Sequence, residues 1–407
     1  MSAPNISPAS ADWSMLSLAD IDPFPAYDVL RERGAVVWDP GIKCWLVLSY
    51  DLCKEIEFDE NKYRIAVADA PPLVFEIKGG RTSVSSLTGD DHKRMRRLYL
   101  KLLGPSVIDQ YRDEHVVPVI NDAIDRFAGN GVAELVNQFS EIVPARIMAS
   151  MFGLPWRDDE LMAGIAEWHR DIVAWVGMGY SGEEAERKAK LASDELNSVF
   201  RPIVLERRDK RGKDIISKVW TLTPEIYGPV GVDEVMSIVR DIELGAGETT
   251  SNAIANTFYL YLTQPEVREA VSSDREGALN AFIEETLRLL GSVQWRFRVA
   301  NQDVLLEGAE VKKNDTICLV HAAANRDPSH YACPHLFDLE RKALTDHIAF
   351  NVGPRVCLGM WLARLKMRES LTAVISRLPD VRLDPTKEAP SFRAFSHRHF
   401  GPLHVVF

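Results

Sequence analysis

The chain has 407 residues, of which 46% are hydrophobic and 26% are charged, as in an ordinary globular protein. This length allows one large domain or two to three smaller ones, with a sizeable buried core. The net charge of -11 argues against a general nucleic-acid binder, because phosphate binding needs a basic surface.

No repeat, low-complexity block or long Gly/Ser linker interrupts the chain. We therefore expect one domain over residues 1–407, with an irregular N-terminal segment at 1–19. The stretch 35–50 ("AVVWDPGIKCWLVLSY") predicts a β-hairpin. Residues 297–325 and the closing 401–407 also predict short strands.

Helical periodicity dominates from about Asp91 to Leu290. Apolar residues recur there at i, i+3, i+4 and i+7 in five segments: 115–128, 140–153, 160–178, 232–263 and 276–290. A further long helix is expected at 360–378. The predicted fold class is mainly α, with small antiparallel β-sheets.

The five cysteines show no CxxC pair, which is typical of a reducing compartment. We find no signal-peptide pattern at the N-terminus and no run of 18 apolar residues. The expected location is the cytoplasm, without a membrane anchor.

One cysteine, Cys357, lies in "FNVGPRVCLG" just ahead of the predicted helix 360–378. An isolated cysteine usually packs as a small hydrophobic residue. Ahead of a helix, however, amide N–H groups and the helix dipole stabilise a thiolate. Gly353 and Gly359 remove Cβ atoms where a flat ligand could approach the backbone. The pattern indicates a thiolate that binds haem iron.

Two other motifs accompany this loop. "EETLR" places Glu285 and Arg288 on one helical face, and "FDLER" supplies Arg341. A Glu–Arg pair alone is common on surface helices. Three buried charges need one another as partners, so we predict a structural triad.

The central helix contains "GAGETT", residues 245–250. Each glycine weakens a helix by about 1 kcal/mol relative to alanine. We expect a local opening in which Thr249 bonds to the backbone, next to the acid Glu248.

These motifs together resemble the cytochrome P450 family of haem-thiolate monooxygenases in its soluble bacterial form, from about Asp20 to Phe407. The resemblance implies the cytochrome P450 fold, with haem b between the central long helix and the helix after the cysteine loop. It also implies that Cys357 is the axial ligand, in a loop shaped by Phe350, Gly353 and Gly359.

The resemblance further implies which residues hold the haem propionates. They are His92, Arg96, Arg298 and Arg355. Two anionic propionates need cations, and arginine offers bidentate bonds to carboxylates. Thr249 and Glu248 would form the catalytic pair that delivers protons.

The chain departs from the family pattern at three places. Ala246 stands where a glycine is usual, Ser292 where a proline is common, and "TGDD" replaces a Pro pair before His92. None of these changes touches the ligand, acid or alcohol positions. We expect them to alter the shape of the pocket rather than the chemistry.

The implied activity is insertion of one oxygen atom of O2 into a small hydrophobic molecule, by hydroxylation or O-demethylation. Two alternatives are a non-oxygenating haem-thiolate sensor or ligand-binding protein, and a peroxide-driven enzyme of the same fold. The pair Glu248 and Thr249 favours the monooxygenase, because a sensor has no use for a proton relay.

No flavin or nicotinamide motif follows in the sequence, so we expect electrons from a separate iron-sulfur ferredoxin and its flavin-dependent reductase. The expected docking surface is basic and comprises Arg94, Arg97, Lys101 and Arg364. We expect a monomer that binds neither nucleic acid nor membrane.

A substrate pocket is also implied by the resemblance. Its expected lining is Leu73, Val74, Phe75, Trp168, Trp175, Met178, Asp241, Leu244, Gly245, Val293, Trp295 and Phe395. Ordinary core packing is the alternative for each. Terpenes, aromatic acids, steroids and fatty acids all remain open. Asp241 shares a helical face with Glu248 and needs a partner, which is either an arginine of the protein or a basic nitrogen of the substrate.

Overall fold

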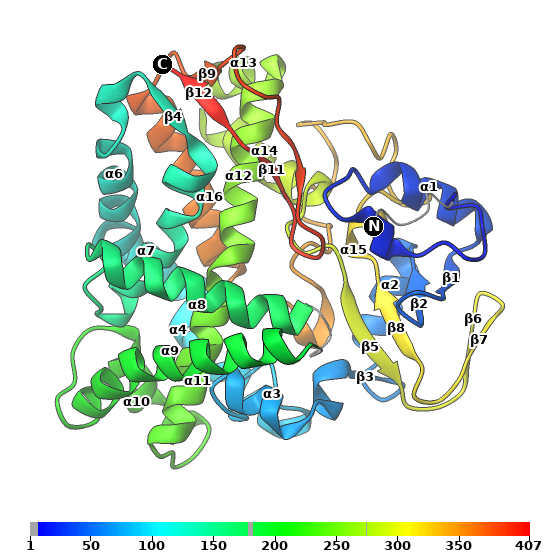
Figure 1. Ribbon diagram of the computed structural model, residues 1–407, viewed down its shortest axis with the longest axis horizontal. Coiled ribbons are helices and arrows are strands. Elements are labelled where there is room, and N and C mark those ends of the chain that lie inside the picture. The colour runs from blue at the N-terminus through cyan, green and yellow to red at the C-terminus, as the bar shows by residue number, and fades with distance from the viewer. Residues whose placement is uncertain (1–6, 178–181, 274) are drawn as a thin grey trace.

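The computed structural model describes residues 7–177, 182–273 and 275–407. Helices fill the left of the view in Figure 1, and a five-stranded sheet stands on the right. Within the described residues, no helix is long and apolar enough to cross a membrane. This arrangement matches the predicted mainly α class with small sheets.

The helices are α1 Phe24–Arg33, α2 Tyr50–Phe58, α3 Pro72–Ile77, α4 Gly89–Leu103, α5 Pro105–Tyr111, α6 Val117–Asp125, α7 Ile142–Phe152, α8 Asp159–Gly177, α9 Glu183–Asp209, α10 Ile215–Ile226, α11 Val232–Ala246, α12 Glu248–Thr263, α13 Pro265–Ser273, α14 Arg275–Leu289, α15 His321–Ala324 and α16 Met360–Arg377. Helices α6, α7, α8, α14 and α16 confirm the segments predicted from periodicity, with ends that differ by a few residues. Figure 1 shows α12 and α16 side by side in the helical body.

The central segment 232–263, predicted as one helix, is two helices. Helix α11 ends at Ala246 and α12 begins at Glu248, with Gly247 at φ −85° and ψ −95° between them. The Thr249 hydroxyl donates to the carbonyl of Gly245 (3.2 Å), and Ser251 donates to that of Gly247 (3.2 Å). These side chains satisfy carbonyls near the break, so the predicted local opening is present.

The strands are β1 Val36–Asp39, β2 Cys44–Val47, β3 Tyr63–Ile65, β4 Val132–Glu134, β5 Arg296–Ala300, β6 Val304–Leu306, β7 Ala309–Val311, β8 Thr316–Leu319, β9 Arg382–Leu383, β10 Ser391–Arg393, β11 His399–Gly401 and β12 His404–Val406. The large sheet has the order β1-β2-β8-β5-β3, and its β1–β2 hairpin confirms the prediction at 35–50. The pair β2–β8 is parallel, an arrangement that a hairpin cannot form and that the long connection between these strands permits.

Several short features were not foreseen, among them a strand and a 3-10 helix. Strand β4 lies inside the region predicted as helical and pairs with β12 from the C-terminus. Its three residues are too few to show an alternating pattern. Within the N-terminal segment expected to be irregular, Met15–Leu18 form a 3-10 helix. The Met15 amide donates to Asp39 Oδ2 (2.8 Å), which anchors this segment to the sheet.

A buried ion cluster joins α14 to the loop that precedes Cys357. Glu285 accepts two hydrogen bonds from Arg288, both at 2.7 Å, and one from Arg341 at 3.1 Å. Arg288 also donates to the carbonyls of Asn325 and Pro334 (3.0 and 2.7 Å). The cluster therefore fixes the course of the connection between the sheet and the cysteine loop, because each buried charge has a partner there.

Replacing the central acid should destabilise the protein strongly. Glu285→Gln leaves two buried guanidinium groups without their counter-charge, so the free energy of unfolding in urea should fall by about 3–5 kcal/mol. The matched control is Glu184→Gln, which breaks an i,i+3 pair with Arg187 on the surface of α9. That variant should unfold like the wild type, since exposed pairs contribute little. Equal stability of the two variants would contradict the role of the cluster.

Candidate active site

The loop from Phe350 to Gly359 leads into α16. The amide of Cys357 donates to the carbonyl of Phe350 (2.8 Å), which closes the loop, and Gly359 precedes the first helical residue. Gly353 has φ +68°, and a Cβ there would lie 3.2 Å from the ring of Phe58. Glycine is therefore required where the loop crosses the end of α2.

The side chain of Cys357 is accessible to water, although many protein atoms lie around it. Burial raises the pKa of the Cys357 thiol, while the amide of Gly359 and the charges of Arg296 and Arg364 lower it. The pKa of Cys357 is raised overall. The amide at the start of the helix stabilises the thiolate as expected, but burial has the larger effect. A bound metal ion removes a thiol proton outright, and such binding is compatible with this site.

Four side chains predicted from the sequence to be cationic come together beside this loop. His92 and Arg96 lie one turn apart on α4, Arg355 lies in the loop itself, and Arg298 lies on β5. Arg96 Nη1 donates to the carbonyl of Val356 (2.9 Å). Burial lowers the pKa of His92 to about 4, and the charge of Arg355 lowers it further.

The arginines of this group are only partly satisfied by the protein. Arg355 pairs with Glu60 (2.6 Å), and Arg298 pairs with Glu57. The buried Nε of Arg298 has no hydrogen-bond partner among the described residues. A spare buried donor next to several positive charges fits an anionic ligand such as the propionates of haem.

The sequence analysis missed a further arginine of this group, Arg296. Its side chain is accessible yet enclosed by protein, as that of Cys357 is. Burial lowers the pKa of Arg296, and the nearby Cys357 raises it. Residues i and i+2 of a strand point to the same face, so the spacing of Arg296 and Arg298 could have revealed it.

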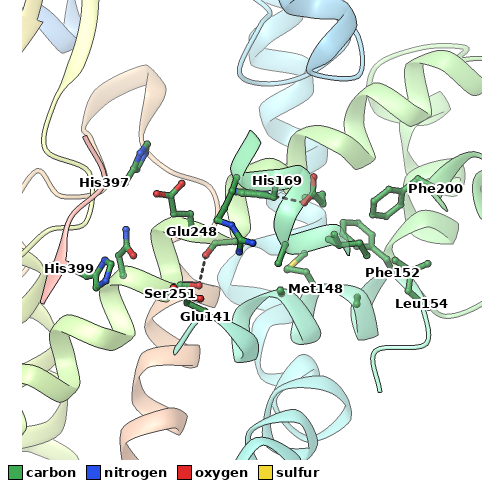
Figure 2. A pocket seen from close by; sticks show the side chains of 18 of the residues that line it. Glu141, Met148, Phe152, Leu154, His169, Phe200, Glu248, Ser251, His397 and His399 are labelled. Atoms are coloured by element: carbon green, nitrogen blue, oxygen red, sulfur yellow. Dashed lines mark hydrogen bonds and ion pairs between the residues drawn. The ribbon is translucent and has the colours of Figure 1, made fainter. Parts of the chain in front are cut away.

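At the break in the central helix, Glu248 and Thr249 are adjacent residues. Successive helical residues point about 100° apart, so the two side chains project in different directions. The hydroxyl of Thr249 lies over the carbonyl of Gly245, and Glu248 lines a cavity on its own side of the helix (Figure 2). Burial raises the pKa of Glu248, while the charge of His169 lowers it.

The partner expected for Asp241 was wrong. No arginine pairs with it among the described residues; instead Ser85 and Tyr99 donate to its two oxygens, the latter at 2.7 Å. Lys78 donates to the same Ser85 hydroxyl (3.3 Å), and its pKa is lowered by burial and raised by the charge of Asp241. The protein itself thus supplies a hydrogen-bond donor to each oxygen of this carboxylate.

The residues expected to line a substrate pocket differ in their surroundings. Val74, Phe75 and Trp175 are buried, whereas Leu73, Trp168, Leu244 and Val293 are half-buried. Trp295 packs edge-to-face on Phe395, with ring centroids 4.8 Å apart. A Cβ on Gly245 would meet no atom within 4 Å, so this position borders open space. Met178 lies outside the described residues.

Comparisons with known proteins agree on one family. The family model for cytochrome P450 matches residues 36–395. A putative cytochrome P450, YjiB of Bacillus subtilis (strain 168), is 28% identical over 361 residues, covering 88% of this chain and 87% of the relative. The C-19 steroid 1alpha-hydroxylase of Sorangium cellulosum (strain So ce56) is 29% identical over 332 residues, with 78% of each chain covered.

A solved structure supports the same assignment. The crystal structure of CYP109E1 from Bacillus megaterium in complex with testosterone superposes with a TM-score of 0.81 at 25% identity. The match covers 95% of this chain and 99% of that one. The chain therefore belongs to the cytochrome P450 family, as an oxygen-incorporating oxidoreductase that uses haem b.

Proposed function

We propose that this protein hydroxylates a hydrophobic substrate with one oxygen atom of O2, and that Cys357 is the axial ligand of its haem. The observation that supports this most is the accessible thiol of Cys357, which lies near the guanidinium groups of Arg296, Arg364 and Arg96. Haem bound there would supply the reductive activation of dioxygen.

The roles of the surrounding residues follow from their chemistry. His92, Arg96, Arg298 and Arg355 bind the propionates, because a carboxylate accepts charge-assisted hydrogen bonds from such donors. The loop residues Phe350, Gly353 and Gly359 hold the thiolate in position. Arg296 adds a fourth arginine to this group, beside the His92 ring, whose pKa is lowered to about 4.

Thr249 and Glu248 deliver the protons that dioxygen reduction consumes. Thr249 offers a hydroxyl at the break in the helix, and Glu248 offers an acid whose pKa is raised by burial. A carboxyl group whose pKa is raised keeps its proton to a higher pH than an ordinary glutamic acid does, which suits it to general-acid work. A sensor or a peroxide-driven enzyme would gain nothing from this pair, so we favour the monooxygenase.

For the substrate we propose a hydrophobic molecule, with steroids as the first class to test. One relative is named a steroid hydroxylase, and one similar structure holds testosterone. These names support hydroxylation, with O-demethylation as the second possible outcome. Titration of a steroid, a fatty acid, a terpene and an aromatic acid against the haem absorption spectrum would identify the class that binds.

We also propose a ferredoxin partner, a cytoplasmic location and a monomeric state. Of the four residues of the basic docking surface, Arg94 pairs with Asp91, and Arg364 binds Glu284 through two hydrogen bonds (2.6 and 2.7 Å). Among the described residues, Arg97 and Lys101 have no ion-pair partner, and both are exposed. An acidic ferredoxin would meet these two cations first.

Replacement of the axial ligand should change the spectrum of the haem. In the reduced carbon monoxide complex, the wild type should show the strongly red-shifted Soret band of thiolate ligation, and Cys357→His should lose it. The exposed Cys333 is the matched control, since Cys333→Ser should keep the band. An unchanged spectrum of Cys357→His would exclude this cysteine as the ligand.

Loss of the Thr249 hydroxyl should uncouple electron use from product formation. In Thr249→Ala, haem content and substrate affinity should stay near the wild-type values, because the side chain is small and bonds only locally. The fraction of consumed electrons recovered as hydrogen peroxide should rise. Measurement of product and peroxide per electron checks this, and equal yields in both proteins would refute the proton role.

Charge reversal on the docking surface should slow electron transfer. Arg97→Glu combined with Lys101→Glu should reduce the association rate with an acidic ferredoxin and flatten its dependence on salt, because exposed charges act mainly on association. Stopped-flow reduction at low ionic strength measures this rate. The double reversal of Lys188 and Lys190 on α9 is the control, and a similar slowing there would contradict the location of the surface.

A further inference from the structure

A cavity of about 250 Å³ lies beside the break in the central helix. In Figure 2, Phe152, Leu154 and Phe200 gather at one end, Glu248 and His397 lie at the other, and His169 lies between them. Its lining includes the exposed side chains of Glu141 and Arg170 as well as buried groups, so the cavity connects the surface with Glu248. This size is sufficient for several water molecules.

His169, on α8, occupies the wall of this cavity at the break. Its ring lies against Gly247, where a Cβ would come within 3.0 Å of the ring carbon Cε1. Its Nδ1 lies 3.1 Å from Glu243 Oε1. The buried Nε2 has no hydrogen-bond partner among the described residues, and neither has Glu243 Oε2. One nitrogen is thus held by an acid, and the other is free to exchange a proton.

The charges around His169 favour its protonated form. Burial works to lower the pKa of His169, but the hydrogen bond and charge of Glu243, followed by the charge of Glu248, outweigh it and raise the pKa. The other titratable groups that face this pair are Glu141, Arg170, Arg240 and His397. Burial lowers the pKa of His397 to about 3, so this second imidazole is neutral at physiological pH.

We propose that His169 is the proton donor that reloads Glu248 from the cavity, with Glu243 as the group that positions and stabilises its imidazolium. The proposal rests on the monooxygenase function above and names the route by which its protons arrive. In each transfer, the Nε2 proton of His169 passes through water in the cavity to the Glu248 carboxylate. The neutral ring then takes a proton from water in the cavity, and Glu243 stays charged.

A purely structural role is the competing explanation, in which the pair of His169 and Glu243 only braces the broken helix. His169→Gln separates the two explanations, because a glutamine amide can still donate to Glu243 but cannot carry a proton. The matched control is His115→Gln. His115 is also partly buried and hydrogen-bonded, to Ser150 at 2.9 Å, but it does not line this cavity.

The first measurement is dioxygen uptake by the holoenzyme, with a surrogate ferredoxin and reductase and with testosterone as the probe. A directly transferring acid or base contributes roughly 10²–10⁴-fold, and water replaces it in part, so His169→Gln should lower uptake by about tenfold. Its solvent deuterium isotope effect should rise. Wild-type uptake should fall as pH increases through the raised pKa of His169, and the variant should lack this dependence, whereas His115→Gln should match the wild type.

The second measurement does not depend on turnover. Histidine NMR signals of the diamagnetic ferrous carbon monoxide complex should include one, absent in His169→Gln, that titrates above the ordinary value of about 6.5. Glu243→Gln should lower that pKa. The role of Glu243 would be overturned if the His169 signal titrated below the ordinary value, or if its pKa were the same in Glu243→Gln as in the wild type.

The outcomes separate the proposal from the function on which it rests. If His169→Gln matched the wild type in dioxygen uptake, isotope effect and pH dependence, the proton relay would be rejected. The monooxygenase function would still stand. Reduced uptake with an unchanged isotope effect and pH profile would assign His169 to bracing alone. A wild type that binds haem but incorporates no oxygen into any compound of the substrate panel would overturn both.

Discussion

The interruption of the central helix at Gly247 is the constraint around which the site is arranged. In the interior of a continuous α-helix, each backbone carbonyl accepts a hydrogen bond from the N–H group four residues later. Here Thr249 and Ser251 instead donate to carbonyls at the break, and the absence of a side chain on Gly247 admits the ring of His169. Gly247 therefore allows His169 of α8 to lie beside the segment that carries the acid Glu248 and the alcohol Thr249.

Positive charge is concentrated near the cysteine loop. Four arginines lie near one another here, namely Arg96, Arg296, Arg298 and Arg355. Among the described residues, Glu57 and Glu60 are the acids that form ion pairs with them. Buried charge of one sign is costly without counter-charge. The two carboxylates of haem b would supply it, so binding of the cofactor should stabilise the fold as well as enable the reaction.

The carboxylate of Asp241 has hydrogen-bond partners within the protein. Its two oxygens accept hydrogen bonds from Ser85 and Tyr99, and its charge raises the pKa of the nearby Lys78, which burial lowers. The network ties α11 to α4 and to the loop after α3. A half-buried carboxylate that accepts hydrogen bonds from two other segments specifies a tertiary arrangement.

The sequence by itself determined the family, the mainly helical class, the long helices and the motifs around Cys357, Glu285 and Glu248. These features depend on local periodicity, on glycine positions and on the order of motifs, all of which are written along the chain. Only the tertiary structure decided the parallel pair β2–β8, strand β4 and the partners of Asp241. It alone brought His169 to Gly247, because helix α8 and the central helix meet only when the chain is folded, and no spacing in the sequence records which face of α8 turns inward at that point.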